Sequence, residues 1–280
     1  MKKTLLFVAF LLVCVLGFGQ SERPYFIRYR TANDTVYLNT HSVNGIHIDS
    51  LGHELTHEDG TAWSALTDLD TVYIYRESEE HDWVDLGLPS GLLWATCNVG
   101  ASSPEDYGAY FAWAETQPKG YYDWSTYTYT CGDWDDLTKY CNDSYCGCNG
   151  YTDILTILQA GDDAATANWG SGWRTPTREE WEELLDHCTS VWTTQNGVRG
   201  QCFTGPNGNT LFLPAAGYRW DGRLYYAGSY GYYWSSSLYT DGPSYAWYCY
   251  FSSGYCDMSD YGIGRNTGHS VRAVRSVRQK

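Results

Sequence analysis

Apolar and polar residues alternate in two short runs near the C-terminus, 244–251 and 255–258, on either side of Ser252-Ser253-Gly254. Alternation with a period of two predicts half-buried β-strands, and a glycine-containing connection between two such runs predicts a hairpin. Residues 83–101 show a comparable pattern around Pro89-Ser90-Gly91. A strand, a turn and a second strand are therefore expected there as well.

Helical periodicity is confined to two segments. Thr177 and Glu180 form a capping-box pattern directly after a proline. Apolar residues then recur at helical spacing, at Trp181, Leu184, Leu185 and Cys188. Residues 153–159 are a second, weaker helix candidate. Two short helices among many short strands indicate an α+β domain.

The first 19 residues have the pattern of a bacterial secretory signal peptide. Two lysines precede an apolar run over residues 5–16, and Gly17 and Gly19 provide small residues for cleavage. The run is shorter than the roughly 20 residues that a spanning helix needs, and no later segment is apolar enough to span. The prediction is an exported protein without a transmembrane segment, located in the periplasm, on the cell surface or outside the cell.

Residues 25–76 contain a weak internal repeat with an offset of 26 residues. Each copy is predicted to form a hairpin followed by a short strand, and Ile46 and Ile48 of the first copy correspond to Val72 and Ile74 of the second. We expect a small β module of about fifty residues.

This module contains His53-Glu54-Leu55-Thr56-His57, the H-E-x-x-H pattern of zinc proteases. In those enzymes the two histidines bind one metal ion because they lie one helical turn apart. The repeat predicts a strand here instead, on which the two rings would be about 13 Å apart. We therefore expect no zinc site in this segment.

The composition limits the classes of partner. The chain has 18 basic and 33 acidic residues and a formal charge of −15, which argues against nucleic acid as a partner. Its 26 tyrosines, 13 tryptophans and 29 glycines indicate short strands and turns rather than long helices.

Ten cysteines are present, and nine remain once Cys14 leaves with the signal peptide. Export permits disulfides. Cys146-Gly147-Cys148 does not match a two-pair zinc pattern, and we expect this segment to be joined by a disulfide to Cys131 or Cys141. Three aspartates nearby, Asp133, Asp135 and Asp136, could bind calcium, but a solvated loop is the preferred interpretation and no cofactor is predicted.

Several motifs between residues 82 and 277 resemble the Fibrobacter succinogenes major paralogous domain family. The motifs are YGAYFAWAE at 107–115, LTKYC at 137–141, DDAATANWG at 162–170, WRTPT at 173–177, LFLPAAGYR at 211–219, YWSSS at 233–237 and SVR at 270–272. The chain departs from the family pattern at Ala114, where glycine is expected, and at Ala273, where proline is expected.

This resemblance implies a C-type-lectin-like fold, related to formylglycine-generating enzymes and to the variable proteins of diversity-generating retroelements. In those variable proteins the C-terminal hairpin and its loops form the binding face. The corresponding hairpin here is predicted to bury Trp247 and Phe251 and to present Tyr248, Tyr250, Tyr255 and Asp257. Residues of the same kind lie on the loops nearby: Tyr239, Asp241, Asp260, Tyr261, Arg265 and Asn266.

Cys249 and Cys256 are predicted to face one another across this hairpin, either as a disulfide or as two buried thiols. The preferred function is non-catalytic recognition of a glycan or a surface protein, because tyrosine provides stiff contact area and a hydroxyl group. Two alternatives remain open. One is an enzyme of the formylglycine-generating type, although its cysteine motif is missing. The other is a structural adhesin or surface-coat subunit.

Overall fold

The computed structural model describes residues 81–276 continuously and, before them, five separate strands. The chain divides into two compact units, residues 1–79 and 80–280. Residues 1–19, the expected signal peptide, lie outside the described residues. In the part of the chain that is described, no helix is long and apolar enough to cross a membrane.

The N-terminal unit is built from antiparallel strands. One sheet has the order β2-β1-β5, formed by Thr35–Asn39, Tyr25–Arg30 and Thr71–Arg76. A second pair joins β3 (Val43–Ile48) to β4 (His53–His57). The H-E-x-x-H segment is therefore a strand, as predicted. Residues 58–70, which contain part of the second repeat copy, lie outside the described residues.

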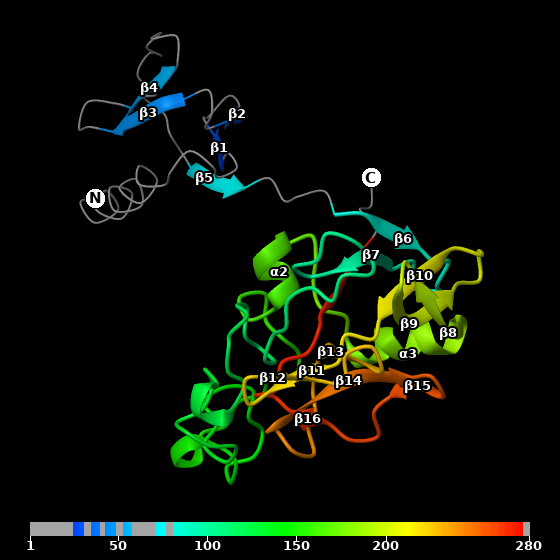
Figure 1. Cartoon of the computed structure of the whole chain (residues 1–280). Coiled ribbons are helices and arrows are strands. Elements are labelled where there is room, and N and C mark those ends of the chain that lie inside the picture. The colour runs from blue at the N-terminus through cyan, green and yellow to red at the C-terminus, as the bar shows by residue number, and fades with distance from the viewer. Residues whose placement is uncertain are drawn as a thin grey trace. The chain divides into compact units, whose positions relative to one another are not determined.

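The C-terminal unit contains three antiparallel sheets and one small hairpin (Figure 1). Its strands are β6 (Trp83–Asp85), β7 (Leu93–Asn98), β8 (Thr189–Gln195), β9 (Val198–Thr204), β10 (Thr210–Pro214), β11 (Tyr218–Trp220), β12 (Arg223–Tyr225), β13 (Tyr230–Leu238), β14 (Tyr245–Ser252), β15 (Tyr255–Met258), β16 (Ile263–Gly264) and β17 (Arg272–Arg275). The sheet orders are β17-β7-β6, β10-β9-β8 and β13-β14-β15, with β16 also pairing with β14, and β11 pairs with β12. With two short α-helices, this is an α+β unit dominated by antiparallel strands.

Helix α3 (Arg178–His187) is the helix that the capping box predicts. The Thr177 hydroxyl accepts the Glu180 backbone N–H at 3.3 Å, and the Glu180 carboxylate accepts the Thr177 N–H at 2.9 Å. Trp181 and Leu184 are fully buried, and α3 contacts β13, β14 and β15 (Figure 1). The prediction of this helix is confirmed.

The second helix is not where periodicity placed it. Residues 153–159 form no helix; Ile157 makes an isolated bridge to Ser237, and the Asp153 carboxylate accepts the backbone N–H groups of Tyr140 and Cys141. The prediction was wrong because these long-range bonds hold the segment extended. Helix α2 (Ala164–Trp169) follows instead, and Asp163 caps it by accepting the N–H groups of Ala165 and Thr166.

A cluster of buried side chains joins α3 to the inner face of the β13-β14-β15 sheet. Trp181 lies 4.8 Å from Trp94 and 6.1 Å from Tyr233, measured between ring centroids, and Tyr233 stacks on Phe251 at 5.7 Å. A Cβ at Gly231 would lie 2.0 Å from the Phe251 ring. Only glycine at this position lets the Phe251 ring fill the inner face beneath β13.

The chain departs from the pattern of the resembled family at two positions, and the backbone conformation accounts for one of them. Ala114 adopts φ 67°, in the left-handed region that favours glycine, and its side chain is buried. The expected glycine is therefore explained by backbone conformation, and this chain tolerates alanine there. Nothing in the structure explains the absence of proline at Ala273.

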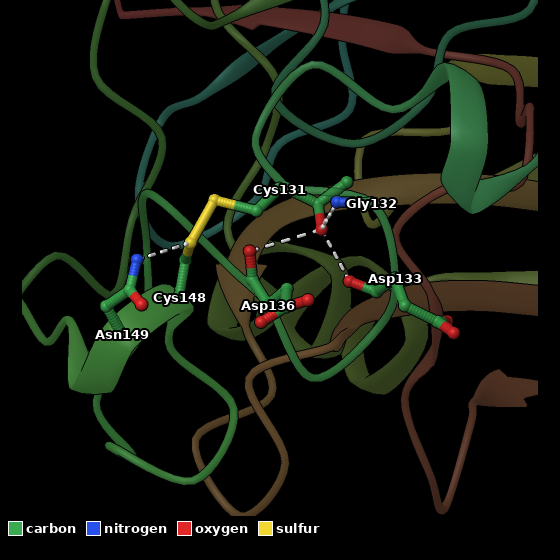
Figure 2. Close-up of a disulfide and its surroundings, with 7 residues drawn as sticks. Cys131, Gly132, Asp133, Asp136, Cys148 and Asn149 are labelled. Atoms are coloured by element: carbon green, nitrogen blue, oxygen red, sulfur yellow. Dashed lines mark hydrogen bonds between the residues drawn. A yellow bond between two sulfur atoms is a disulfide. The ribbon is translucent and has the colours of Figure 1, made fainter.

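A disulfide joins Cys131 to Cys148 (Figure 2). This confirms the prediction that the Cys146–Cys148 segment is joined to Cys131 or Cys141. The carbonyl groups of Asp133 and Asp136 accept the Thr130 hydroxyl, and the Asp133 carboxylate accepts the Trp134 N–H at 2.7 Å. The loop of aspartates is thus organised around backbone hydrogen bonds beside the disulfide.

Candidate functional site

The C-terminal hairpin is present, with a register different from the predicted one. Cys249 pairs with Met258, Phe251 with Cys256 and Ser252 with Tyr255, so the connection is the two residues Ser253 and Gly254. The prediction that Cys249 faces Cys256 was wrong by two residues. Both cysteines are free thiols, and no disulfide joins them.

The two faces of the hairpin are nevertheless as predicted. A shift of two residues leaves every side chain on its original face, because side chains alternate with a period of two. Cys249 and Phe251 are fully buried and Met258 is nearly so, while Trp247 packs partly buried against the same cluster. Tyr255 and Asp257 are exposed, and Tyr248 and Tyr250 are half-buried.

The neighbouring strand β13 extends this outward surface. Tyr232 pairs with Tyr250 and Tyr230 pairs with Ser252, so the two β13 tyrosines share the face of the hairpin tyrosines. Tyr232 stacks on Tyr248 at 5.9 Å between ring centroids, and Tyr230 stacks on Tyr250 at 5.7 Å. The sheet therefore presents two adjacent rows of phenol rings.

Hairpin β11–β12 continues the surface further. Tyr218 lies 4.9 Å from Tyr232, and Tyr226 lies 5.1 Å from Tyr230, again between centroids. We call the resulting surface the tyrosine face and define it by Tyr218, Trp220, Tyr225, Tyr226, Tyr230, Tyr232, Tyr248, Tyr250 and Tyr255. Trp220, Tyr226 and Tyr255 are the most exposed of these, at 45%, 54% and 44%.

Sequence reasoning missed six of these nine residues. The alternation Tyr230, Tyr232, Trp234 before β14 was a usable signal, because a strand paired with 248–250 must share its outward face. The contribution of β11–β12 had no comparable signal, since a three-residue strand is too short for periodicity to be read.

Five hydroxyl groups of the tyrosine face have a raised pKa and are neutral at physiological pH: those of Tyr218, Tyr232, Tyr248, Tyr250 and Tyr255. Burial raises the pKa of Tyr232 and Tyr248, and burial and neighbouring rings raise the pKa of Tyr250. Asp257 and Asp260 are exposed beside Tyr255 and, together with burial, raise its pKa as well. The surface thus offers aromatic area and uncharged hydroxyls with an acidic rim.

Two of the predicted ligand-binding residues lie inside the domain. Arg265 is fully buried and Asn266 is 5% exposed. The Arg265 guanidinium donates to the Tyr127 hydroxyl and to the carbonyl groups of Tyr140, Pro243 and Lys139, at 2.9–3.0 Å. Arg265 therefore joins three loops, and neither residue belongs to an exposed recognition surface.

The remaining predicted residues lie on the loops before β14 and after β15. Tyr261 is 73% exposed, and Asp241 and Asp260 are also exposed. Tyr239 is half-buried because its ring packs edge-on against Trp247 at 4.9 Å. These four residues are separate from the stacked rings of the tyrosine face.

His269 is fully buried next to the tyrosine face. Its ring stacks on Trp234 at 3.9 Å, and the rings of Tyr218, Tyr232 and Tyr248 lie within 6.0 Å. The Thr267 hydroxyl donates to the Gly264 carbonyl, so the His269 Nε2–H donates to Thr267 at 3.1 Å. With no acidic side chain among these neighbours, burial holds the pKa of His269 well below its usual value.

A pH dependence of stability follows from this histidine. An unfolded histidine takes up a proton below about pH 6.5 and the native one does not, so native stability is complete above that pH and falls by about 1.4 kcal/mol per pH unit below it. Urea unfolding at pH 6.5 and 5.0 should show the wild type losing about 2 kcal/mol more than the H269Q variant. H187Q, which replaces a histidine exposed on α3, provides the control variant. Equal slopes for the wild type and H269Q would contradict the assignment.

Residues 81–276 contain no group of three or more His, Cys, Asp or Glu side chains that could hold a metal ion. Burial raises the pKa of Cys249 well above its usual value and that of Cys256 to about 11. Both thiols are thus protonated at neutral pH, where a thiol nucleophile needs its thiolate form.

Comparison with known families gives one match. A family model described as the Lcl C-terminal domain matches residues 88–275, more than half of the chain. The chain belongs to the Lcl C-terminal domain family. Neither a curated protein nor a solved structure was found to match.

The Lcl C-terminal domain of this chain contains the whole tyrosine face and the hairpin that carries it. It begins after β6 and ends in β17, so it includes all but the first strand of the C-terminal unit. Membership of the family names neither a ligand nor a reaction, and any function rests on the geometry described above.

Proposed function

We propose that this protein is an exported, surface-exposed binding protein without catalytic activity, whose tyrosine face recognises a glycan or a surface protein. The observation that carries the proposal is the continuous row of partly exposed phenol rings, in stacked, tilted and edge-to-face contact, across β11–β12, β13, β14 and β15. Such rings supply rigid contact area, and their hydroxyls supply hydrogen bonds at a low entropic cost.

The ligand class follows from charge. The tyrosine face has uncharged hydroxyls and an acidic rim at Asp257 and Asp260, and the whole chain has a formal charge of −15. Polyanionic glycans are therefore disfavoured, and an uncharged sugar chain or a neutral to basic protein surface is favoured. The C-type-lectin-like fold implied by the resemblance to the Fibrobacter family belongs to the same proposal.

The test is binding of the purified protein to an array of glycans and surface proteins. The double variant Y250S/Y255S should bind its array ligand at least tenfold more weakly, because aromatic residues near the centre of an interface typically contribute 1–2 kcal/mol or more each. Tyr255 is exposed and Tyr250 is half-buried, so the fold should tolerate both changes. Tyr145, 90% exposed and outside the tyrosine face, provides the matched control Y145S.

Equal binding by Y250S/Y255S and the wild type would reject the tyrosine face as the binding surface. Sedimentation of the same proteins separates recognition from the structural alternative. Self-association of the wild type that is lost in Y250S/Y255S would show that the rings pack against another copy of the chain rather than a foreign ligand.

A further inference from the structure

A cleft of about 470 Å³ lies on the C-terminal unit and shares no residue with the tyrosine face. It is bounded by the first turn of α2, the loop that leads into α3, strand β13 and the end of β17. Its size is in the range of pockets that hold small ligands. The residues that matter for its chemistry are Ile157, Asp163, Trp173, Arg174, Ser236 and Arg275.

Ser236 provides a buried polar group without a partner. The residue is 3% exposed, and its hydroxyl makes no hydrogen bond within residues 81–276. Both backbone groups of Ser236 are hydrogen-bonded, since its N–H donates to the Pro176 carbonyl at 2.8 Å and its carbonyl accepts the Leu158 N–H at 2.9 Å. A buried hydroxyl left unpaired costs about 1–3 kcal/mol. A ligand in the cleft would supply the missing partner.

Arg275 provides the uncompensated charge. Its guanidinium carbon lies 5.1 Å from the centroid of the Trp173 ring, and within the described residues it makes no ion pair. Arg174 differs, because both of its terminal nitrogens bind the Glu180 carboxylate at 2.5–2.6 Å. An arginine fixed on an aromatic ring with free donors suits a planar carboxylate.

The acidic residue of the cleft, Asp163, does not compete with a ligand carboxylate for Arg275. Asp163 is 3% exposed, and its carboxylate accepts the backbone N–H groups of Ala165, Thr166 and Thr175 and the Thr175 hydroxyl, at 2.8–3.1 Å. Its lone pairs are occupied by two donors at the start of α2 and by two donors of Thr175, and these four hydrogen bonds stabilise its negative charge. Asp163 therefore shapes the cleft and leaves Arg275 to meet the ligand.

Part of the cleft lining is apolar. Ile157 is 42% exposed at the cleft, and Leu158 and Ala160 line it beside Ile157. A hydrocarbon group placed against these side chains would cover apolar surface that water now contacts, at roughly 25 cal/mol per Å². The cleft thus combines one cation, one unpaired hydroxyl and one apolar wall.

We propose that this cleft binds a small carboxylate that carries an apolar group and a polar atom, such as an N-acylated aliphatic amino acid or the last residue of a peptide. The carboxylate pairs with Arg275, the apolar group covers Ile157 and Leu158, and a polar atom of the ligand meets the Ser236 hydroxyl. The free amino-acid derivative and the peptide C-terminus share this chemistry.

Calorimetric titration of the full chain with N-acetyl-leucine, N-acetyl-leucinamide and the peptide Gly-Gly-Leu tests the proposal. N-acetyl-leucine should bind with at least tenfold higher affinity than its amide, because the amide cannot pair with Arg275. Tighter binding of Gly-Gly-Leu than of N-acetyl-leucine would identify a peptide end as the natural source, and the reverse order a free small molecule.

Two variants and one control connect the binding to the cleft. R275Q should lower the affinity for N-acetyl-leucine at least tenfold. R199Q, which removes an exposed arginine on β9, should leave this affinity unchanged. S236A should weaken binding about twofold to tenfold while leaving the free protein equally stable or more stable, because it removes an unpaired buried hydroxyl. Failure of both carboxylates to bind at 10 mM, equal affinity for acid and amide, or no effect of R275Q would overturn the proposal.

Discussion

Replacing Arg265 by methionine is expected to destabilise the C-terminal unit by about 3–5 kcal/mol. The side chain is fully buried, and its donors meet one hydroxyl and three carbonyl oxygens from the 127, 139–140 and 243 segments. Its guanidinium also lies 4.9 Å from the Trp113 ring centroid. Methionine fills part of the volume and leaves all four acceptors buried without a donor.

Urea unfolding of R265M and of the matched variant R199M measures the effect. Arg199 is exposed on β9, so R199M should change the free energy of unfolding by no more than about 0.5 kcal/mol. A cost below 1 kcal/mol for R265M would show that Arg265 does not hold these loops together.

Reduction of the Cys131–Cys148 disulfide is expected to cost about 3 kcal/mol. The bond closes a loop with a sequence separation of 17, and a crosslink over a loop of this length lowers the entropy of the unfolded chain by about that amount. Hydrogen bonds also anchor the loop, since the Asn142 side chain donates to the Thr240 carbonyl at 2.9 Å and Arg265 donates to the Lys139 and Tyr140 carbonyls.

The comparison to make is between the wild type and C131S/C148S, each unfolded with and without dithiothreitol. Reductant should lower the stability of the wild type to that of the double variant and leave the variant unchanged. C202S, which removes a cysteine that the structure shows as a free thiol, should respond to reductant as the wild type does. A wild type insensitive to reductant would mean that the disulfide stabilises the native state little or is not formed in solution.

The tyrosine face and the carboxylate cleft are independent of each other. They share no residue, so the variants that test one are expected to leave the other unchanged. Y250S/Y255S should therefore keep its affinity for N-acetyl-leucine, and R275Q should keep its binding to an array ligand. This separation makes the failure of one proposal distinguishable from the failure of the other.

Local interactions allowed part of the fold to be predicted. Helix α3 was predictable because its capping box and its buried stripe, Trp181 and Leu184, lie within one short segment. The segment 153–159 was mispredicted as a helix because its conformation depends on bonds from Tyr140, Cys141 and Ser237, which are distant in sequence. The cap of α2 at Asp163 was a local signal that periodicity alone did not detect.

The candidate site also has features that the sequence predicted and features that depend on distant contacts. The sequence by itself determined which side chains of the hairpin point outward, because alternation has a period of two and survives the two-residue error in register. Only the tertiary structure decided that Arg265 and Asn266 are buried, that β11–β12 and β13 extend the tyrosine face, and that Ser236 and Arg275 share a cleft. These facts depend on which segments meet across the fold. Many weak long-range contacts bring those segments together, and such contacts produce no local sequence pattern.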